Sequence, residues 1–238
     1  MNERASYTMQ TSKWSIKQYE NLIDMYKTVQ RGYDSEWAKN RGGEIAHLFP
    51  LYNTQHDDYP NEWIYDTTYG MPICGSEDNM VDFNASYNEL VNAGFAHICL
   101  WHNHRLGAFQ SPTDILSFIA KEHWTCMVID ASNYLLVFQK TDESIDIITQ
   151  LAGHLGEYAI FERHIERLNE EWAQTRAQIF RDRYLNNLIK LIDDERAFSK
   201  LFMEAHEEMM LCSLSAYERE WRFKCFIFPK HLDNKLFA

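Results

Sequence analysis

Glycine, proline and long hydrophobic runs are all scarce in this sequence. Only 9 Gly and 5 Pro occur among 238 residues, which excludes collagen-like and low-complexity chains. No apolar stretch is long enough to cross a bilayer, and residues 1–14 lack the hydrophobic segment of a secretory signal. We therefore expect an intracellular, cytoplasmic protein that does not contact a membrane.

Positive charge is also in short supply. The chain carries 23 Lys and Arg against 35 Asp and Glu, a formal net charge of -12. Residues 1–155 alone hold 20 acidic and 10 basic residues. An acidic surface repels phosphate backbones, so nucleic acid is excluded as the expected partner and a protein with a basic face is favoured.

The five cysteines form neither a disulfide framework nor a zinc motif. They are odd in number, widely spaced, and contain no Cys-x-x-Cys pair. Cys99 and Cys126 lie inside apolar runs, where we expect buried free thiols. Any metal site in this chain must therefore draw mainly on His, Asp or Glu.

The distribution of glycine predicts where the chain divides. All nine Gly residues lie between Gly32 and Gly156, and residues 157–228 contain neither Gly nor Pro. This change in composition predicts two parts, a domain at 1–152 and an extension at 153–238.

The first part combines helical spacing of apolar residues with short apolar runs. We expect helices at 15–30, 84–93 and 114–122, and strands at 44–51, 95–101, 124–130 and 134–139. Residues 53–82, rich in Asp, Asn, Tyr and Gly, are expected to be irregular. The order of these elements predicts an α/β sandwich around a mixed sheet.

The second part has apolar residues at spacings of three and four throughout. The pattern predicts that residues 157–228 are entirely helical, in two or three long helices that form a hairpin or small bundle. Asp193 and Asp194 are expected to begin a further helix. The many charged residues of this part are expected to lie on solvated faces.

Two histidines directly follow the apolar run 95–101. At positions i and i+2 of an extended chain, His102 and His104 point to the same side, so both imidazoles can reach one metal ion. Gly107 lets the next loop turn back, and Asp114, in the first turn of the following helix, can add an oxygen ligand. Two His and one Asp leave a fourth tetrahedral position for water, which is typical of catalytic zinc.

The same residues also have a structural interpretation. Ser111-Pro112-Thr113-Asp114 is a capping box, with Ser111 as N-cap, Pro112 in the first helical position and Asp114 at N3. A single His-x-His is weak evidence for a metal site. The two motifs in succession, separated by a short loop with a glycine, are much less frequent by chance than either alone.

A hydrolytic zinc site needs a base that takes a proton from the metal-bound water. Glu44 precedes the apolar run 45–49 and is the favoured candidate. Glu36 is the alternative, although its polar surroundings are more typical of a solvated helix. His47 lies within this apolar run and could come near the site, but strand alternation gives no basis for adding it as a metal ligand.

Glu44 before a strand, His102-x-His104 and Ser111-x-x-Asp114, in this order, resemble the JAMM (JAB/MPN-type) zinc metallopeptidase family. The resemblance covers about residues 15–150. It implies a cytidine-deaminase-like, JAB-type fold with a mixed sheet between helices, here followed by an all-α extension. It further implies that zinc is bound by His102, His104 and Asp114, with Glu44 as general acid/base and Ser111 stabilising the oxyanion.

The implied activity is that of an isopeptidase or peptidase that acts on a ubiquitin-like protein or its conjugates. The extension of such a prokaryotic-type member would bind the modifier, the target or a partner subunit. Two features depart from the family pattern: Arg105 replaces the usual Pro after the second His, and the loop from His104 to Ser111 is one residue short. Both concern the shape of the cleft more than metal binding.

Two other functions fit the same fold. A metal-free member would serve as a scaffold, although a scaffold has no need of the intact ligand set. A DNA-repair or phage-assembly member is the second alternative, and the acidic first part argues against direct contact with DNA.

Overall fold

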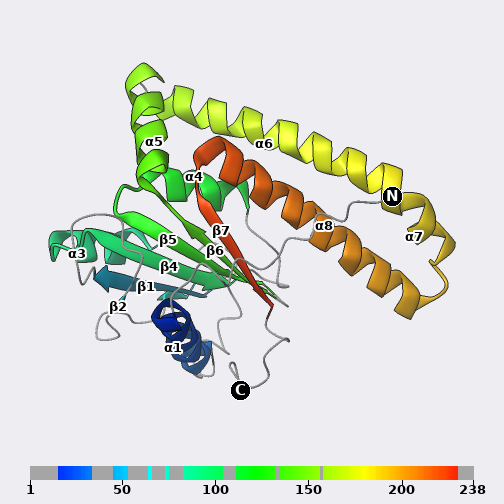
Figure 1. The fold of residues 1–238 in the computed structure, drawn as a ribbon, viewed down its shortest axis with the longest axis horizontal. Coiled ribbons are helices and arrows are strands. Elements are labelled where there is room, and N and C mark those ends of the chain that lie inside the picture. Colours follow the sequence, from blue (N-terminus) through cyan, green and yellow to red (C-terminus); the bar gives the residue numbers. More distant parts are fainter. Residues whose placement is uncertain are drawn as a thin grey trace. The chain divides into compact units, whose positions relative to one another are not determined.

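Helices and strands alternate along the first part of the chain in this computed structural model, and long helices followed by a final strand make up the second (Figure 1). The structure describes residues 16–33, 45–52, 64–65, 73–74, 83–103, 111–131, 134–155 and 158–229. Contacts divide the chain into two units. The sheet unit comprises residues 1–141 and 224–238, and the helical unit comprises residues 142–223.

A mixed sheet forms the centre of the sheet unit. Its strands run in the order β2-β1-β4-β5-β6-β7, and β3 pairs with β1. The longer strands are β1 (Ile45–Tyr52), β4 (His97–Asn103), β5 (Trp124–Asp130), β6 (Tyr134–Gln139) and β7 (Lys224–Pro229); β2 (Ile64–Tyr65) and β3 (Ile73–Cys74) are short. Strands β4 and β5 are parallel, and every other described pair is antiparallel. The prediction of a mixed sheet is confirmed.

The helices of the sheet unit also follow the predicted order. They are α1 (Ile16–Tyr33), α3 (Asn84–Asn92) and α4 (Pro112–Ala120). Helix α3 ends at Asn92, and Gly94 just beyond it takes a φ of +90°, which glycine adopts at little cost, with its N–H donating to Val91 O. Helix α4 forms the crossover between the parallel strands β4 and β5, as such a pair requires.

Helices cover both faces of the sheet. Trp101 of β4 packs against Tyr26 of α1, with 6.2 Å between the ring centroids. The next residue, His102, contacts Asp114 of α4. Because successive strand side chains point to opposite faces, α1 and α4 lie on opposite sides of the sheet. The predicted α/β sandwich is therefore present.

The helical unit is built from a long antiparallel hairpin and a shorter helix. Its elements are α5 (Asp142–Leu155), α6 (Tyr158–Phe180), η3 (Arg181–Leu185), α7 (Asn186–Lys190) and α8 (Glu195–Trp221). Asp194 caps α8 by accepting a hydrogen bond from Ala197 N at 3.0 Å, which confirms that the Asp193-Asp194 pair begins a helix. Arg183 and Tyr184 both donate to Glu208 and so hold the two arms together.

The prediction of helix as far as residue 228 was wrong at its end, and the extension is not all-α. Helix α8 stops at Trp221, Arg222 takes a left-handed conformation with φ 56°, and residues 224–229 form β7. This strand pairs with β6 in a register that joins Gln139 to Lys224. Its apolar residues favour extended structure, and the edge of β6 satisfies their backbone hydrogen bonds, which overrides the local helical spacing.

Candidate metal site and its surroundings

Two of the three predicted metal ligands meet on the α4 side of the sheet. His102 lies near the end of β4, and Asp114 lies in the first turn of α4. His102 Nε2 is 3.2 Å from Asp114 Oδ1. His102 is buried at 5% exposure, and the Asp114 side chain is 17% exposed. Residues twelve positions apart in the sequence thus present two ligand atoms to one point.

Ser111 determines how Asp114 is turned. Ser111 N donates to Asp114 Oδ2 at 2.5 Å, and Asp114 N donates to Ser111 Oγ at 3.2 Å. This is the capping box expected from the sequence, with Pro112 in the first turn. Since the box uses only Oδ2 of the carboxylate, Oδ1 stays directed at His102. The structural and the chemical interpretation of this motif are therefore compatible.

The spacing of these two atoms fits a zinc ion. Tetrahedral zinc with nitrogen and oxygen ligands places neighbouring ligand atoms about 3.4 Å apart. The observed 3.2 Å between His102 Nε2 and Asp114 Oδ1 is close to this value. The same two atoms form a close imidazole–carboxylate contact, and a bound cation would lie between them.

The beginning of β1 lies beside this end of β4. Ala46 is the register partner of His102, and Ile45 N donates to Asn103 Oδ1 at 2.7 Å. Ile45 directly follows Glu44 in the chain, and Asn103 directly precedes His104. The described backbone thus brings together the two strand ends that lead to the remaining predicted site residues.

Several predicted residues lie outside the part of the chain that the structure describes. They are Glu44, Glu36, His104, Arg105 and Gly107. Within the described ranges, no group of three or more His, Cys, Asp and Glu residues comes together as a metal site. The ligand role of His104 and the proton-transfer role of Glu44 stay predictions.

His47 belongs to the other face of the sheet. It pairs with Trp101 in the β1–β4 register, one position from the Ala46–His102 pair. Its ring stacks on Phe49 at 5.7 Å, and neither ring nitrogen has a hydrogen-bond partner among the described residues. Burial lowers the pKa of His47 from 6.5 to about 4, so the ring is neutral at pH 7. This placement agrees with leaving His47 out of the ligand set.

Sequence reasoning assigned no role to Lys140, which is buried in the sheet unit at 1% exposure. Its Nζ donates to Lys121 O at 2.7 Å and lies 4.9 Å from the centroid of the Phe118 ring. Burial lowers the pKa of Lys140 to about 7, although the nearby carboxylate of Glu122 acts in the opposite direction. Nothing in the sequence indicates that a lysine directly after an apolar strand is buried. Its contact secures the end of α4, the helix that carries Asp114.

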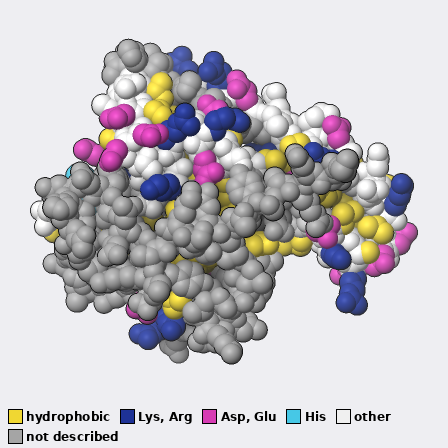
Figure 2. Space-filling model, in the orientation of Figure 1, with side chains coloured by type: hydrophobic (Ala, Val, Ile, Leu, Met, Phe, Trp, Pro, Cys, Tyr) yellow, Lys and Arg dark blue, Asp and Glu magenta, His cyan; other side chains and the backbone are white. Residues whose placement is uncertain are grey.

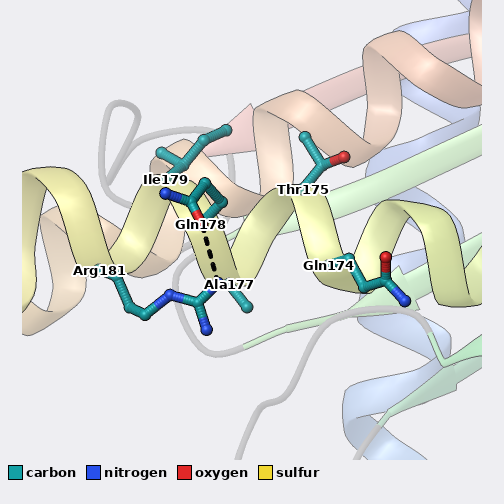
Figure 3. Close-up of a pocket in the computed structure, with 6 residues that line it drawn as sticks. All are labelled: Gln174, Thr175, Ala177, Gln178, Ile179 and Arg181. Carbon is teal, nitrogen blue, oxygen red and sulfur yellow. Dashed lines mark hydrogen bonds between the residues drawn. The ribbon is translucent and has the colours of Figure 1, made fainter.

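The helical unit carries a hollow of about 620 Å³ on the surface of α6 and η3 (Figure 3). Its lining consists of Gln174, Thr175, Ala177, Gln178, Ile179 and Arg181. Arg181 Nη2 donates to Gln178 Oε1 at 2.8 Å across this surface. Amides, a hydroxyl and one cation include no base that could activate the hydroxyl and no metal ligand set, so the hollow is not a candidate for the chemistry.

Comparisons of the chain with models of protein families, with curated proteins and with solved structures find no match.

None of the described helices combines the length and the hydropathy that crossing a lipid bilayer requires. The four cysteines with described side chains, at positions 99, 126, 212 and 225, are free thiols.

Proposed function

We propose that the protein is a zinc-dependent peptidase of the JAMM type, which hydrolyses an isopeptide or peptide bond at a ubiquitin-like protein. The contact between His102 Nε2 and Asp114 Oδ1 supports this most directly, because two expected ligands converge with the spacing that zinc requires. The α/β sandwich and the parallel β4–α4–β5 crossover supply the frame expected for such a site. The JAB-type fold and the ligand role of His104 are parts of the proposal.

The chain's own residues have distinct roles in this proposal. His102, His104 and Asp114 hold the ion, which when bound supplies Lewis acidity and a hydroxide at neutral pH. Glu44 takes the proton of the attacking water and passes it to the leaving amine. Ser111 Oγ accepts a hydrogen bond from Asp114 N, which leaves the hydroxyl hydrogen to donate to the oxyanion of the substrate.

The helical unit is proposed to bind the protein substrate, a ubiquitin-like modifier or its conjugate. Large apolar side chains are exposed there, namely Leu185, Ile189, Ile192, Phe202 and Met203. Figure 2 shows hydrophobic side chains gathered around α7. Exposed apolar residues of this size, set among charged ones, are typical of protein-binding surfaces.

Metal analysis and cleavage assays on the full chain test the proposal. We expect one zinc per chain, removable by a chelator, and hydrolysis of a ubiquitin-like fusion that stops on chelation and returns with zinc. Protein that binds no zinc and cleaves no such fusion would instead support the metal-free scaffold.

The assignment of the base is tested by Glu44→Gln, with Glu36→Gln as the matched control. Glu44→Gln keeps the shape of the side chain but removes its basic carboxylate. Turnover should fall about 10²–10⁴-fold while zinc content and folding stay unchanged. Glu36→Gln should behave as the unaltered protein. If Glu36→Gln alone is inactive, Glu36 is the base.

A further inference from the structure

Asn103 makes a contact that the His-x-His motif does not explain. Its side-chain oxygen accepts the N–H of Ile45 at 2.7 Å, across 58 positions of sequence. The register of β1 and β4 runs to the pair Ala46–His102. One residue further, the link between the two strands is the hydrogen bond from Ile45 N to the side chain of Asn103.

The position of Asn103 between the two histidines decides where this side chain points. His102 faces α4, so its neighbour Asn103 faces the α1 side of the sheet. Its register partner on β5 is Asp130, a buried carboxylate to which Gln30 of α1 donates at 3.5 Å. Asn103 is thus directed away from the metal ligands, which excludes it as a ligand to the same ion.

We propose that Asn103 is a positioning residue that fixes the beginning of β1, and with it the preceding Glu44, against the strand that ends in the metal ligands. This inference rests on the proposed function, because it concerns the placement of the base relative to the site. A hydrogen bond at Ile45, the first residue after the proposed base, limits how far that strand end moves. Misplacement of a catalytic group by about 1 Å costs on the order of 10²-fold in rate.

Hydrogen exchange of the Ile45 amide in metal-free protein tests the contact itself. Asn103→Leu keeps the approximate size but removes the acceptor, so the Ile45 amide should exchange at least about tenfold faster than in the unaltered protein. The double variant Asn103→Asp with Asp130→Asn keeps one acceptor beside Ile45 and one carboxylate in the register pair. It should restore slow exchange. Equal exchange in all three proteins would overturn the proposal.

Kinetics of the zinc-loaded proteins test the positioning role. Asn103→Leu should lower kcat about 10–100-fold, with zinc content and KM nearly unchanged, and the double variant should recover most of kcat. Should Asn103→Leu lose zinc, or lose kcat without recovery in the double variant, the residue supports the fold and the proposal is wrong. An active unaltered protein with an equally active Asn103→Leu overturns only the role of Asn103. An unaltered protein that binds no zinc and cleaves nothing overturns the proposed function as well.

Discussion

The sheet unit buries polar side chains, whereas the helical unit exposes apolar ones. His47, His102, Asp130 and Lys140 of the sheet unit are all buried, with at most 6% exposure. In the helical unit, large apolar residues reach 70% exposure at Ile192. Both arrangements cost free energy, since buried polar groups lose hydration unless they are hydrogen-bonded and exposed apolar groups order water. This contrast is one reason for proposing chemistry in the sheet unit and binding in the helical unit.

The packing of the two units explains how one tolerates buried polar side chains and the other exposed apolar ones. A sheet covered by helices on both faces encloses a core that includes Trp101, Phe118 and Phe138, each 0% exposed. That core supplies enough stability to carry several polar groups. In the described part of the helical unit, the arms of the hairpin meet at buried residues that include Leu188 of α7 and Ala205 of α8. Side chains next to this seam on the helix surface therefore stay exposed.

The largest expected effect is at the proposed metal site. His102→Ala removes one of the three proposed protein ligands, and we expect loss of bound zinc and of peptidase activity, because two protein ligands hold zinc poorly. His97→Ala is the control, since His97 lies at the other end of the same strand. It should keep stoichiometric zinc. Zinc in His102→Ala at the level of the unaltered protein contradicts the site.

A large stability difference between the units is expected from two phenylalanines. Phe118→Ala in the sheet unit removes a ring that is 0% exposed and packs edge-on against Trp124 at 5.4 Å. Its free energy of unfolding should fall by about 3–5 kcal/mol. Phe202→Ala in the helical unit, where the ring is 45% exposed, should cost less than about 1 kcal/mol. Chemical denaturation measures both, and equal losses would remove the contrast.

His47 should make the stability of the sheet unit depend on pH. Its pKa is about 4 in the folded protein and 6.5 ordinarily, so between these values the unfolded chain binds a proton that the folded chain does not. Stability should therefore fall as the pH is lowered from 6.5 to 4, by about 3 kcal/mol in total. His47→Leu should remove this part of the slope. Identical pH profiles for the two proteins would show that His47 is protonated as readily in the folded protein as in the unfolded chain.

The smallest effect on stability, and a clear one on binding, is expected at the exposed surface of the helical unit. Ile192→Ser should change the free energy of unfolding by less than about 0.5 kcal/mol. Affinity for the ubiquitin-like substrate should fall about tenfold if this side chain anchors it. Asn186→Ser, at an exposed polar position of α7, serves as the control and should bind normally. Calorimetric titration that finds equal affinities rejects the docking surface.

Local signals in the sequence predicted most of the sheet unit correctly. Short apolar runs predicted β5 and β6, and Gly94 correctly marked the end of α3. The capping box was also predicted, because the Ser111 and Asp114 hydrogen bonds span only three residues. Such features depend on neighbours in the chain, which a single sequence contains in full.

Three features depended on residues far apart in the chain. Strand β7 forms because the edge of β6 accepts it, although the preceding residues favour helix. The burial of Lys140 depends on the carbonyl of Lys121 and the ring of Phe118. The hydrogen bond between Asn103 and Ile45 joins two strands that only the sheet brings together.

The sequence by itself determined which residues have the chemistry for a metal site and which local structures carry them. His102 at the end of a buried run and Asp114 in a capped first turn follow from alternation and capping alone. Only the tertiary structure decided that Nε2 and Oδ1 lie 3.2 Å apart, because that distance depends on how α4 packs across the sheet from β4. Side-chain chemistry is local to each residue, whereas the convergence of two ligands is set by packing between elements.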